Sequence, residues 1–181
     1  MKRGKKLLIL LLALVLVGGG ILAVEKIIEA NIVYMTDKSI PVVSIDTENL
    51  KEIICTYQGE TLTLRKDGDS WIYVEDPSNV PESSVMDEAL NALSDVRADK
   101  ILENAQDMAE YGLAGETLGS VTAVTDTQTV VLQIGRETAF QEQHYVSIGD
   151  GNVYIISDLK FLNRIPMVVS ELQEPTITSS T

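Results

Sequence analysis

The 181-residue sequence predicts an α+β protein, in which an N-terminal transmembrane helix precedes antiparallel β-meander units that are each packed with a helix. A charge-free apolar run, short alternating segments bounded by turn residues, and one amphipathic segment predict this fold. The run covers Leu7–Val24, the alternation starts near residue 42, and the amphipathic segment covers Glu82–Val96. We expect a basic start and membrane anchor at 1–24, a stalk at 25–41, an extracytoplasmic domain at 42–174 and a flexible tail at 175–181.

The apolar run is long enough to cross a bilayer. As a helix, the eighteen residues of Leu7–Val24 span about 27 Å, close to the ~30 Å of a hydrocarbon core. A cleaved signal has a shorter apolar core, of about 7–15 residues, so an uncleaved signal anchor is favoured. Cleavage at Gly20 or Ala23, which would release a secreted domain, remains the alternative, because the glycines at 18–20 disfavour a helix.

Charge predicts the orientation and excludes one class of partner. Four of the fourteen cations precede Glu25, so the rest of the chain carries ten cations against twenty-seven carboxylates. The positive-inside rule then predicts a single-pass protein of the cell membrane with a cytoplasmic N-terminus and an extracytoplasmic body. So acidic a body should repel phosphate backbones, and no nucleic acid partner is expected. The only cysteine, Cys55, can form no internal disulfide and is predicted to be a small buried residue.

Two β-rich blocks make up the predicted body. The first has strands at Asn49–Tyr57, Thr61–Arg65 and Trp71–Val74, followed by the helix Glu82–Val96 with Pro81 near its start. After a connecting stretch, Ala98–Asn104, one helical turn ends at Gly112 in the left-handed conformation. The second block has strands at Val121–Thr125, Thr129–Ile134, Gln143–Ile148 and Val153–Ile156, then a helix at Asp158–Arg164 with Asp158 as its N-cap.

The similar order of elements in the two blocks suggests a duplicated unit, with halves at 42–104 and 105–166. Leu62 and Val131 lie 69 residues apart, and Leu90 and Leu159 share this offset. The alternative is that the offset is coincidental. Both interpretations predict antiparallel sheets that each carry a helix.

Several short motifs together resemble a known family. They are the segment TLTLRKDGDSWIYVEDP before the amphipathic helix, the segment AEYGL, a strand ending in Ile134-Gly135, and the segment HYVSIGDGNVYIIS. Over about Val43–Ser157 they resemble the bacterial family named domain of unknown function 4340. The family usually has a proline just after its Tyr-Gly-Leu, whereas this chain continues from Leu113 with Ala114. The resemblance implies an extracytoplasmic accessory subunit, because members are commonly encoded beside ABC-type transport components, and it carries over no catalytic residue.

The sequence predicts no catalytic, cofactor-binding or metal site. Asp67-Gly68-Asp69-Ser70 and Asp150-Gly151-Asn152 have oxygen ligands suited to calcium, but both stand where hairpin turns need such residues. His144 has no second histidine or cysteine nearby in the sequence, so a surface or half-buried imidazole is expected. Nucleotide-binding glycine motifs and the G-x-S-x-G elbow are absent.

Strand aromatics are the remaining candidates for partner contact. They are Trp71, Tyr73, Tyr145 and Tyr154. On an exposed sheet face these rings could anchor a partner; the alternative, which we favour, is that they fill the core.

Taken together, the sequence predicts a non-enzymatic binding or scaffolding module. Its expected partners are the lipid bilayer, through Leu7–Val24, and ABC-type transporter subunits or other envelope proteins. A cell-envelope hydrolase that uses acidic residues is the competing class, and it requires a concave pocket with convergent carboxylates.

Overall fold

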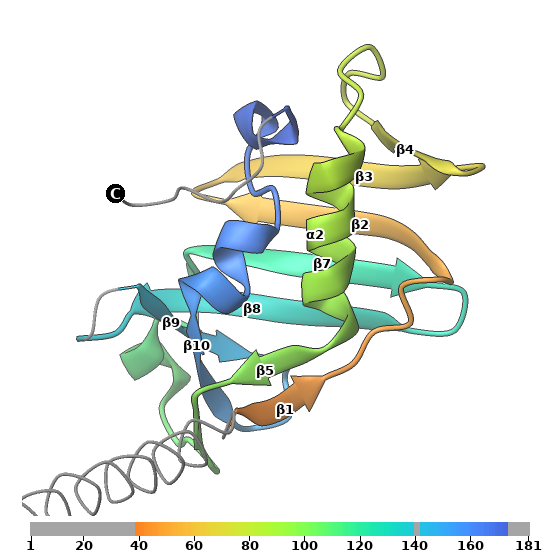
Figure 1. Cartoon of the computed structure of the whole chain (residues 1–181). Helices are drawn as coiled ribbons and strands as arrows, with labels where there is room; N and C mark the ends of the chain where they lie inside the picture. The colour runs from red at the N-terminus through yellow and green to blue at the C-terminus, as the bar shows by residue number, and fades with distance from the viewer. Residues whose placement is uncertain (1–38, 140–141, 174–181) are drawn as a thin grey trace, which may run out of the picture. The chain divides into compact units, whose positions relative to one another are not determined.

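A computed structural model describes residues 39–139 and 142–173 of the chain. Their main feature is one eight-stranded antiparallel sheet, in the order β4-β3-β2-β7-β8-β9-β10-β6 (Figure 1). Its strands are β2 (Leu50–Tyr57), β3 (Glu60–Asp67), β4 (Ser70–Tyr73), β6 (Lys100–Leu102), β7 (Gly119–Thr125), β8 (Thr129–Glu137), β9 (Gln143–Ser147) and β10 (Val153–Ser157). A second, two-stranded sheet pairs β1 (Ile40–Val43) with β5 (Val96–Ala98). The α+β class is confirmed, but the two predicted blocks form one sheet rather than two.

The blocks join through β2 and β7, the third and fourth strands in the order of the sheet. β2 pairs with β7 from Leu50 opposite Thr125 to Tyr57 opposite Gly119. Gly119 is required here, because a Cβ atom would collide with the carbonyl oxygen of Thr56 on the neighbouring strand. This close approach lets the two meanders share one continuous set of backbone hydrogen bonds.

Hairpin turns lie where the sequence predicts them. Gln58 and Gly59 both have positive φ values, 50° and 87°, as a two-residue hairpin between β2 and β3 requires. Gly68 has φ 63° in the turn between β3 and β4, and Gly149 and Gly151 have φ 81° and 85° between β9 and β10. The turn interpretation of the two Asp-Gly segments therefore agrees with their backbone geometry.

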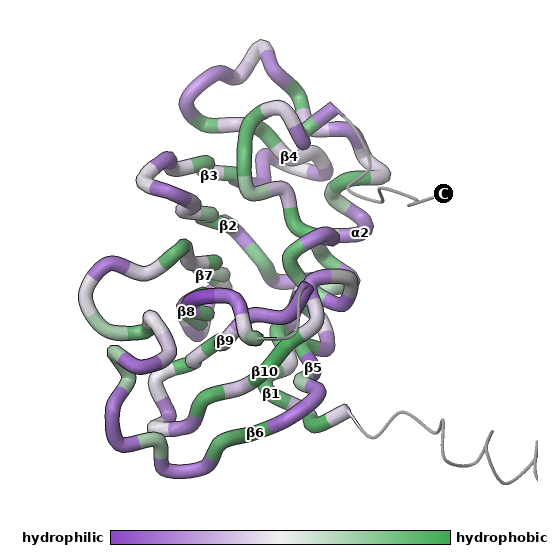
Figure 2. Tube along the Cα trace, turned by 90° about the vertical axis from the view of Figure 1, so that its left-hand side faces the viewer, coloured by the Kyte–Doolittle hydropathy of each residue, from purple (hydrophilic) through white to green (hydrophobic). Residues whose placement is uncertain are grey.

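The one α-helix of the described residues, α2 (Ser83–Ser94), covers one face of the sheet. Val85, Met86, Ala89, Ala92 and Leu93 are its buried residues, and Leu90 is half-buried. Figures 1 and 2 show α2 crossing β3, β2 and β7 on one side of the strands. Because α2 begins at Ser83, Glu82 is its N-cap and the Glu82 carboxylate lies before the first turn. This carboxylate makes no capping hydrogen bond. The core lies between α2 and the sheet.

The predicted second helix, Asp158–Arg164, is wrong in type. The segment forms two short 3₁₀ helices, η2 (Asp158–Lys160) and η3 (Leu162–Arg164), which are separated at Phe161 with φ −138° and ψ −69°. Phe161 exposes only 1% of its surface, so burying this ring interrupts the helical backbone. The N-cap is Ser157 and not Asp158, and no side-chain capping bond forms. A third 3₁₀ helix, η4 (Val169–Leu172), follows.

Two further boundaries differ from the prediction. The stretch Ala98–Asn104 is not only a connection: it contains β6, which pairs with β10, and begins at the end of β5. The first described strand starts before residue 42, since β1 includes Ile40 and Pro41 from the predicted stalk. These strands have three or four residues, too few for an alternating pattern to be visible in the sequence.

The predicted turn before Gly112 is confirmed. It is the 3₁₀ helix η1 (Met108–Tyr111), and Gly112 has φ 69°. The carbonyl oxygen of Tyr111 lies so close to β8 that a Cβ atom at Gly135 would collide with it. Leu62 is buried in β3, whereas Val131 in β8 is 41% exposed and its neighbour Leu132 is buried. The predicted repeat stays a prediction.

The predicted anchor Leu7–Val24, most of the stalk and the tail at 175–181 lie outside the described residues. Within 39–139 and 142–173, no helix combines the length and apolarity needed to span a bilayer.

Candidate functional site

A pocket lies between the edge strand β4 and the first turns of α2. Its volume is about 310 Å³. The β3–β4 hairpin contributes Lys66, Asp69, Ser70 and Trp71, the loop after β4 contributes Val80 and Pro81, and α2 contributes Ser83, Met86, Asp87 and Leu90. We call this site the β4–α2 groove. Figure 1 shows β4 at one edge of the sheet and the N-terminal end of α2 near that edge.

The floor of the groove is apolar and fixed by the core. Trp71 is 8% exposed and Met86 is 3% exposed, and both belong to the core cluster. Val80 lies on the rim and is 55% exposed, the largest value among the large hydrophobic side chains of the described residues. An apolar rim above a buried aromatic floor is typical of a binding surface.

The loop that carries Val80 is held in place from two directions. The side-chain amide of Gln173 donates to the Val80 carbonyl oxygen at 2.8 Å and to Asn79 Oδ1 at 2.9 Å. The backbone N–H of Glu82 donates to the carbonyl oxygen of Leu172 at 2.9 Å. The C-terminal part of the domain therefore positions the groove loop.

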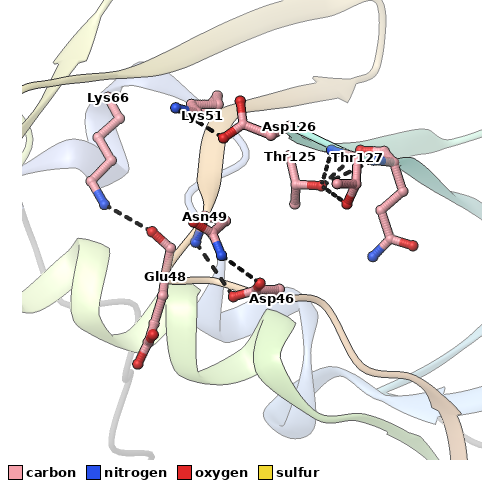
Figure 3. Close-up of polar contacts among 9 residues, drawn as sticks. Asp46, Glu48, Asn49, Lys51, Lys66, Thr125, Asp126 and Thr127 are labelled. Atoms are coloured by element: carbon pink, nitrogen blue, oxygen red, sulfur yellow. Dashed lines mark hydrogen bonds and ion pairs between the residues drawn. The ribbon is translucent and has the colours of Figure 1, made fainter.

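The one cation of the groove is directed to a backbone acceptor. Lys66 Nζ donates to the Glu48 carbonyl oxygen at 3.3 Å, as Figure 3 shows. The turn that presents this carbonyl is itself ordered, because Asn49 Nδ2 donates to Asp46 Oδ2 at 2.7 Å. The two groove carboxylates, Asp69 and Asp87, are exposed and make no ion pair with a described residue. Two carboxylates against one ammonium give the lining of the groove a net negative charge.

Trp71 and Tyr73 also present backbone hydrogen-bonding groups at the edge of the sheet. The Val74 N–H donates to the Thr63 carbonyl oxygen at 2.9 Å, and the register pairs Arg65 with Ile72 and Asp67 with Ser70. Hydrogen-bonded and non-hydrogen-bonded pairs alternate in an antiparallel ladder, so the even-numbered residues of β4 bond to β3. The amide and carbonyl groups of Trp71 and Tyr73 consequently point away from β3, toward the open edge.

The four aromatic residues named from the sequence do not form one patch. Trp71 and Tyr73 lie in β4, and Tyr145 and Tyr154 lie in β9 and β10, with four strands between. Trp71, Tyr73 and Tyr154 are buried in the core cluster, the position that the core interpretation assigns to them. Tyr145 is half-buried and meets Tyr111 edge to face, with ring centroids 5.0 Å apart.

The remaining candidates have structural partners. His144 Nδ1 lies 2.7 Å from Asp158 Oδ1 in a half-buried pair. Asp150 accepts from the Tyr154 hydroxyl at 2.6 Å and from Asn152. Partial burial raises the pKa of Asp150, but these hydrogen bonds together lower it by more, so the pKa is below its ordinary value. In the part of the chain that the structure describes, no three side chains of the metal-binding types are close enough to hold an ion.

Cys55 is fully buried in β2. Burial, together with the smaller effect of the negative charge of Glu171, raises the pKa of its thiol to about 12. Such a thiol is protonated at neutral pH and is a poor nucleophile.

Of the groove residues, only Trp71 was named from the sequence as a candidate for partner contact, and Asp69 and Ser70 were assigned to a hairpin turn. Val80 is an apolar residue inside the polar loop Asp76–Pro81, and that contrast is the one signal that could have indicated a surface role. Asp69 and Asp87 lie 18 residues apart on different elements, and only the packing of α2 on the sheet brings them to one pocket.

Comparison with known proteins identifies the family. Residues 22–114 match the family described as Domain of unknown function (DUF4340). The chain belongs to this family. The matched range starts before the segment whose motifs resemble DUF4340 and ends at the turn after η1, so it includes the β4–α2 groove and excludes β7 to β10. No curated protein and no solved structure matches the chain.

Proposed function

We propose that this DUF4340 chain is a membrane-anchored extracytoplasmic binding module that breaks no bonds and acts as an accessory component of an ABC-type transport or envelope complex. The observation that carries the proposal is the β4–α2 groove, which combines a rigid apolar floor, an exposed apolar rim and two exposed carboxylates. These are features of a surface that binds another molecule. The apolar run Leu7–Val24 supports the membrane location.

Anchoring would increase the encounter of the groove with other envelope proteins. A module held at a membrane meets its neighbours at a high effective concentration, so even a weak contact is occupied. The acidic body supports a partner with a positively charged surface, because opposite charges steer association.

The groove favours binding over the competing hydrolase. An acid–base pair of carboxylates requires at least one to be held protonated, which proteins achieve by burying it. Asp69 and Asp87 are both exposed, and no other carboxylate lines the groove. The other alternative is a secreted domain that is released by cleavage at Gly20 or Ala23. The mass of the N-terminal peptide of the mature protein distinguishes this domain from the anchored form.

Photo-crosslinking in intact membranes tests the proposal. A photoreactive amino acid at Val80 should give one dominant adduct with another envelope protein, and the same amino acid at Val131, also exposed but on β8, should not give that adduct. Replacing Leu7–Val24 with an unrelated membrane anchor should preserve the adduct. Equal adducts from both sites, or release of a small-molecule product by the purified chain, would contradict the proposal.

A further inference from the structure

We infer that the β4–α2 groove binds an extended, positively charged peptide segment, which adds to the open edge of β4 as a ninth strand of the sheet. This inference rests on the proposed binding function and names the chemistry of the partner. Two independent features of the described residues support it: the direction of the backbone groups of β4, and the distribution of charge around the groove.

The backbone of β4 can form a ladder with a new strand. Trp71 and Tyr73 each direct one N–H donor and one C=O acceptor away from β3. An added strand would satisfy these four groups with its own backbone, which is how extended peptides bind to exposed sheet edges. The affinity would come from main-chain hydrogen bonds, so the edge of β4 would accept peptides of different sequence.

The pocket beside β4 supplies side-chain selectivity. In an added strand, alternate side chains point to the face of the sheet that α2 covers, which is the face of Trp71 and Met86. One such side chain can enter the 310 Å³ pocket between Trp71 and Val80. The apolar lining there favours an aliphatic residue over a charged one.

The charge around the groove selects a cationic segment. Asp69 and Asp87 line the pocket, and the exposed Asp67, Glu75 and Asp76 flank the two ends of β4. Lys66 is the one cation that lines the pocket, and its Nζ donates to the neutral Glu48 carbonyl oxygen, so these carboxylates outnumber it and the groove keeps a net negative charge. A second copy of this chain is disfavoured, because pairing β4 with β4 would bring two acidic rims together.

The only tryptophan of the chain lines the groove, so its fluorescence reports binding directly. The probe is the peptide KTVTVTVTVK, titrated into the detergent-solubilised full-length chain. We expect a saturable change in Trp71 emission. The matched peptide ETVTVTVTVE should bind at least tenfold more weakly, and so should a KTVTVTVTVK peptide that is N-methylated at alternate amides along one edge.

Paired charge variants test the location. The double variant Asp69→Lys, Asp87→Lys should weaken binding of KTVTVTVTVK at least tenfold. The matched double variant Glu103→Lys, Glu116→Lys has the same net charge at exposed positions outside the groove, and should change the affinity less than twofold. Unchanged thermal unfolding of both variants shows that any loss is local.

Four outcomes would overturn the inference. Three of them concern the peptide: no saturable change in Trp71 emission, equal affinity for the N-methylated and unmodified peptides, and an equal loss of peptide affinity in both charge variants. The fourth is a Trp71 emission change that saturates as the protein concentration rises without peptide, which would assign the edge to a second copy. If truncating the chain after Gln173 raises the affinity for KTVTVTVTVK tenfold, the natural occupant of the groove would instead be residues 174–181 of the same chain. If the Val80 adduct in membranes persists while the peptide results fail, the binding function stands and only the strand-addition mode is wrong.

Discussion

The imidazole Nδ1 of His144 and the carboxylate Oδ1 of Asp158 lie 2.7 Å apart, and their side chains are only 12% and 16% exposed. This contact joins β9 to the first 3₁₀ helix after β10. Asp158 therefore holds the segment that covers the second half of the sheet, whereas the sequence assigns it to a helix N-cap. The chain has only one histidine, and here it has a structural partner.

Replacing this carboxylate should destabilise the fold. Asp158→Asn keeps the size of the side chain but removes its charge, and a hydrogen bond with a charged partner in a largely buried site contributes about 1.5–3 kcal/mol. We expect the free energy of unfolding to fall by about 2 kcal/mol, measured by urea unfolding with Trp71 fluorescence. Glu110→Gln, at an exposed carboxylate, is the control, and an equal effect of both variants would contradict the assignment.

The Cys55 thiol should make stability depend on pH in the alkaline range. Its folded pKa is about 12 against 9.0 for the free group, so the thiolate forms first in the unfolded chain. The contribution is complete below pH 9.0 and declines as pH rises toward 12. Between pH 8 and pH 10, the wild type should lose about 1 kcal/mol more unfolding free energy than Cys55→Ala. Parallel losses in the two proteins would exclude this linkage.

Gly135 should tolerate no side chain. A Cβ atom there would collide with the Tyr111 carbonyl oxygen and lie 3.0 Å from Leu113 Cγ, where the turn after η1 crosses β8. We expect Gly135→Ala to cost about 1–3 kcal/mol of stability, the usual range for forced packing. Gln133→Ala, an exposed position on the same strand, should change stability by less than about 0.5 kcal/mol. A smaller effect at Gly135 than at Gln133 would show that the turn can move.

Phe161 should be essential to the packing of the 3₁₀ segments. Its ring is 1% exposed and belongs to the core, although it lies between two short helical turns. Phe161→Ala should lower the unfolding free energy by about 3–5 kcal/mol, whereas Asn163→Ala, two residues later and exposed, should have little effect. Hydrogen exchange of the backbone at 158–165 gives an independent measure, and slow exchange in Phe161→Ala would contradict the assignment.

Local patterns in the sequence predicted most of the elements. The strands of the hairpins, the amphipathic stripe of α2 and the left-handed Gly112 all depend on residues close in sequence, where alternation, helical spacing and glycine act directly. The short strands β5 and β6 were missed because three residues carry no measurable alternation, and their pairing depends on β1 and β10. The predicted helix at 158–164 was wrong because burial of Phe161 outweighs local helix propensity.

The sequence by itself determined the family, the α+β class and the acidity of the surface, because motifs, hydrophobic periods and charges are properties of the chain. Only the tertiary structure decided that β2 and β7 merge the two blocks into one sheet and that α2 lies beside the free edge of β4. Both depend on contacts between residues far apart in sequence, such as Gly119 against Thr56 and Trp71 against the α2 face, whose energies arise only when the packed surfaces meet.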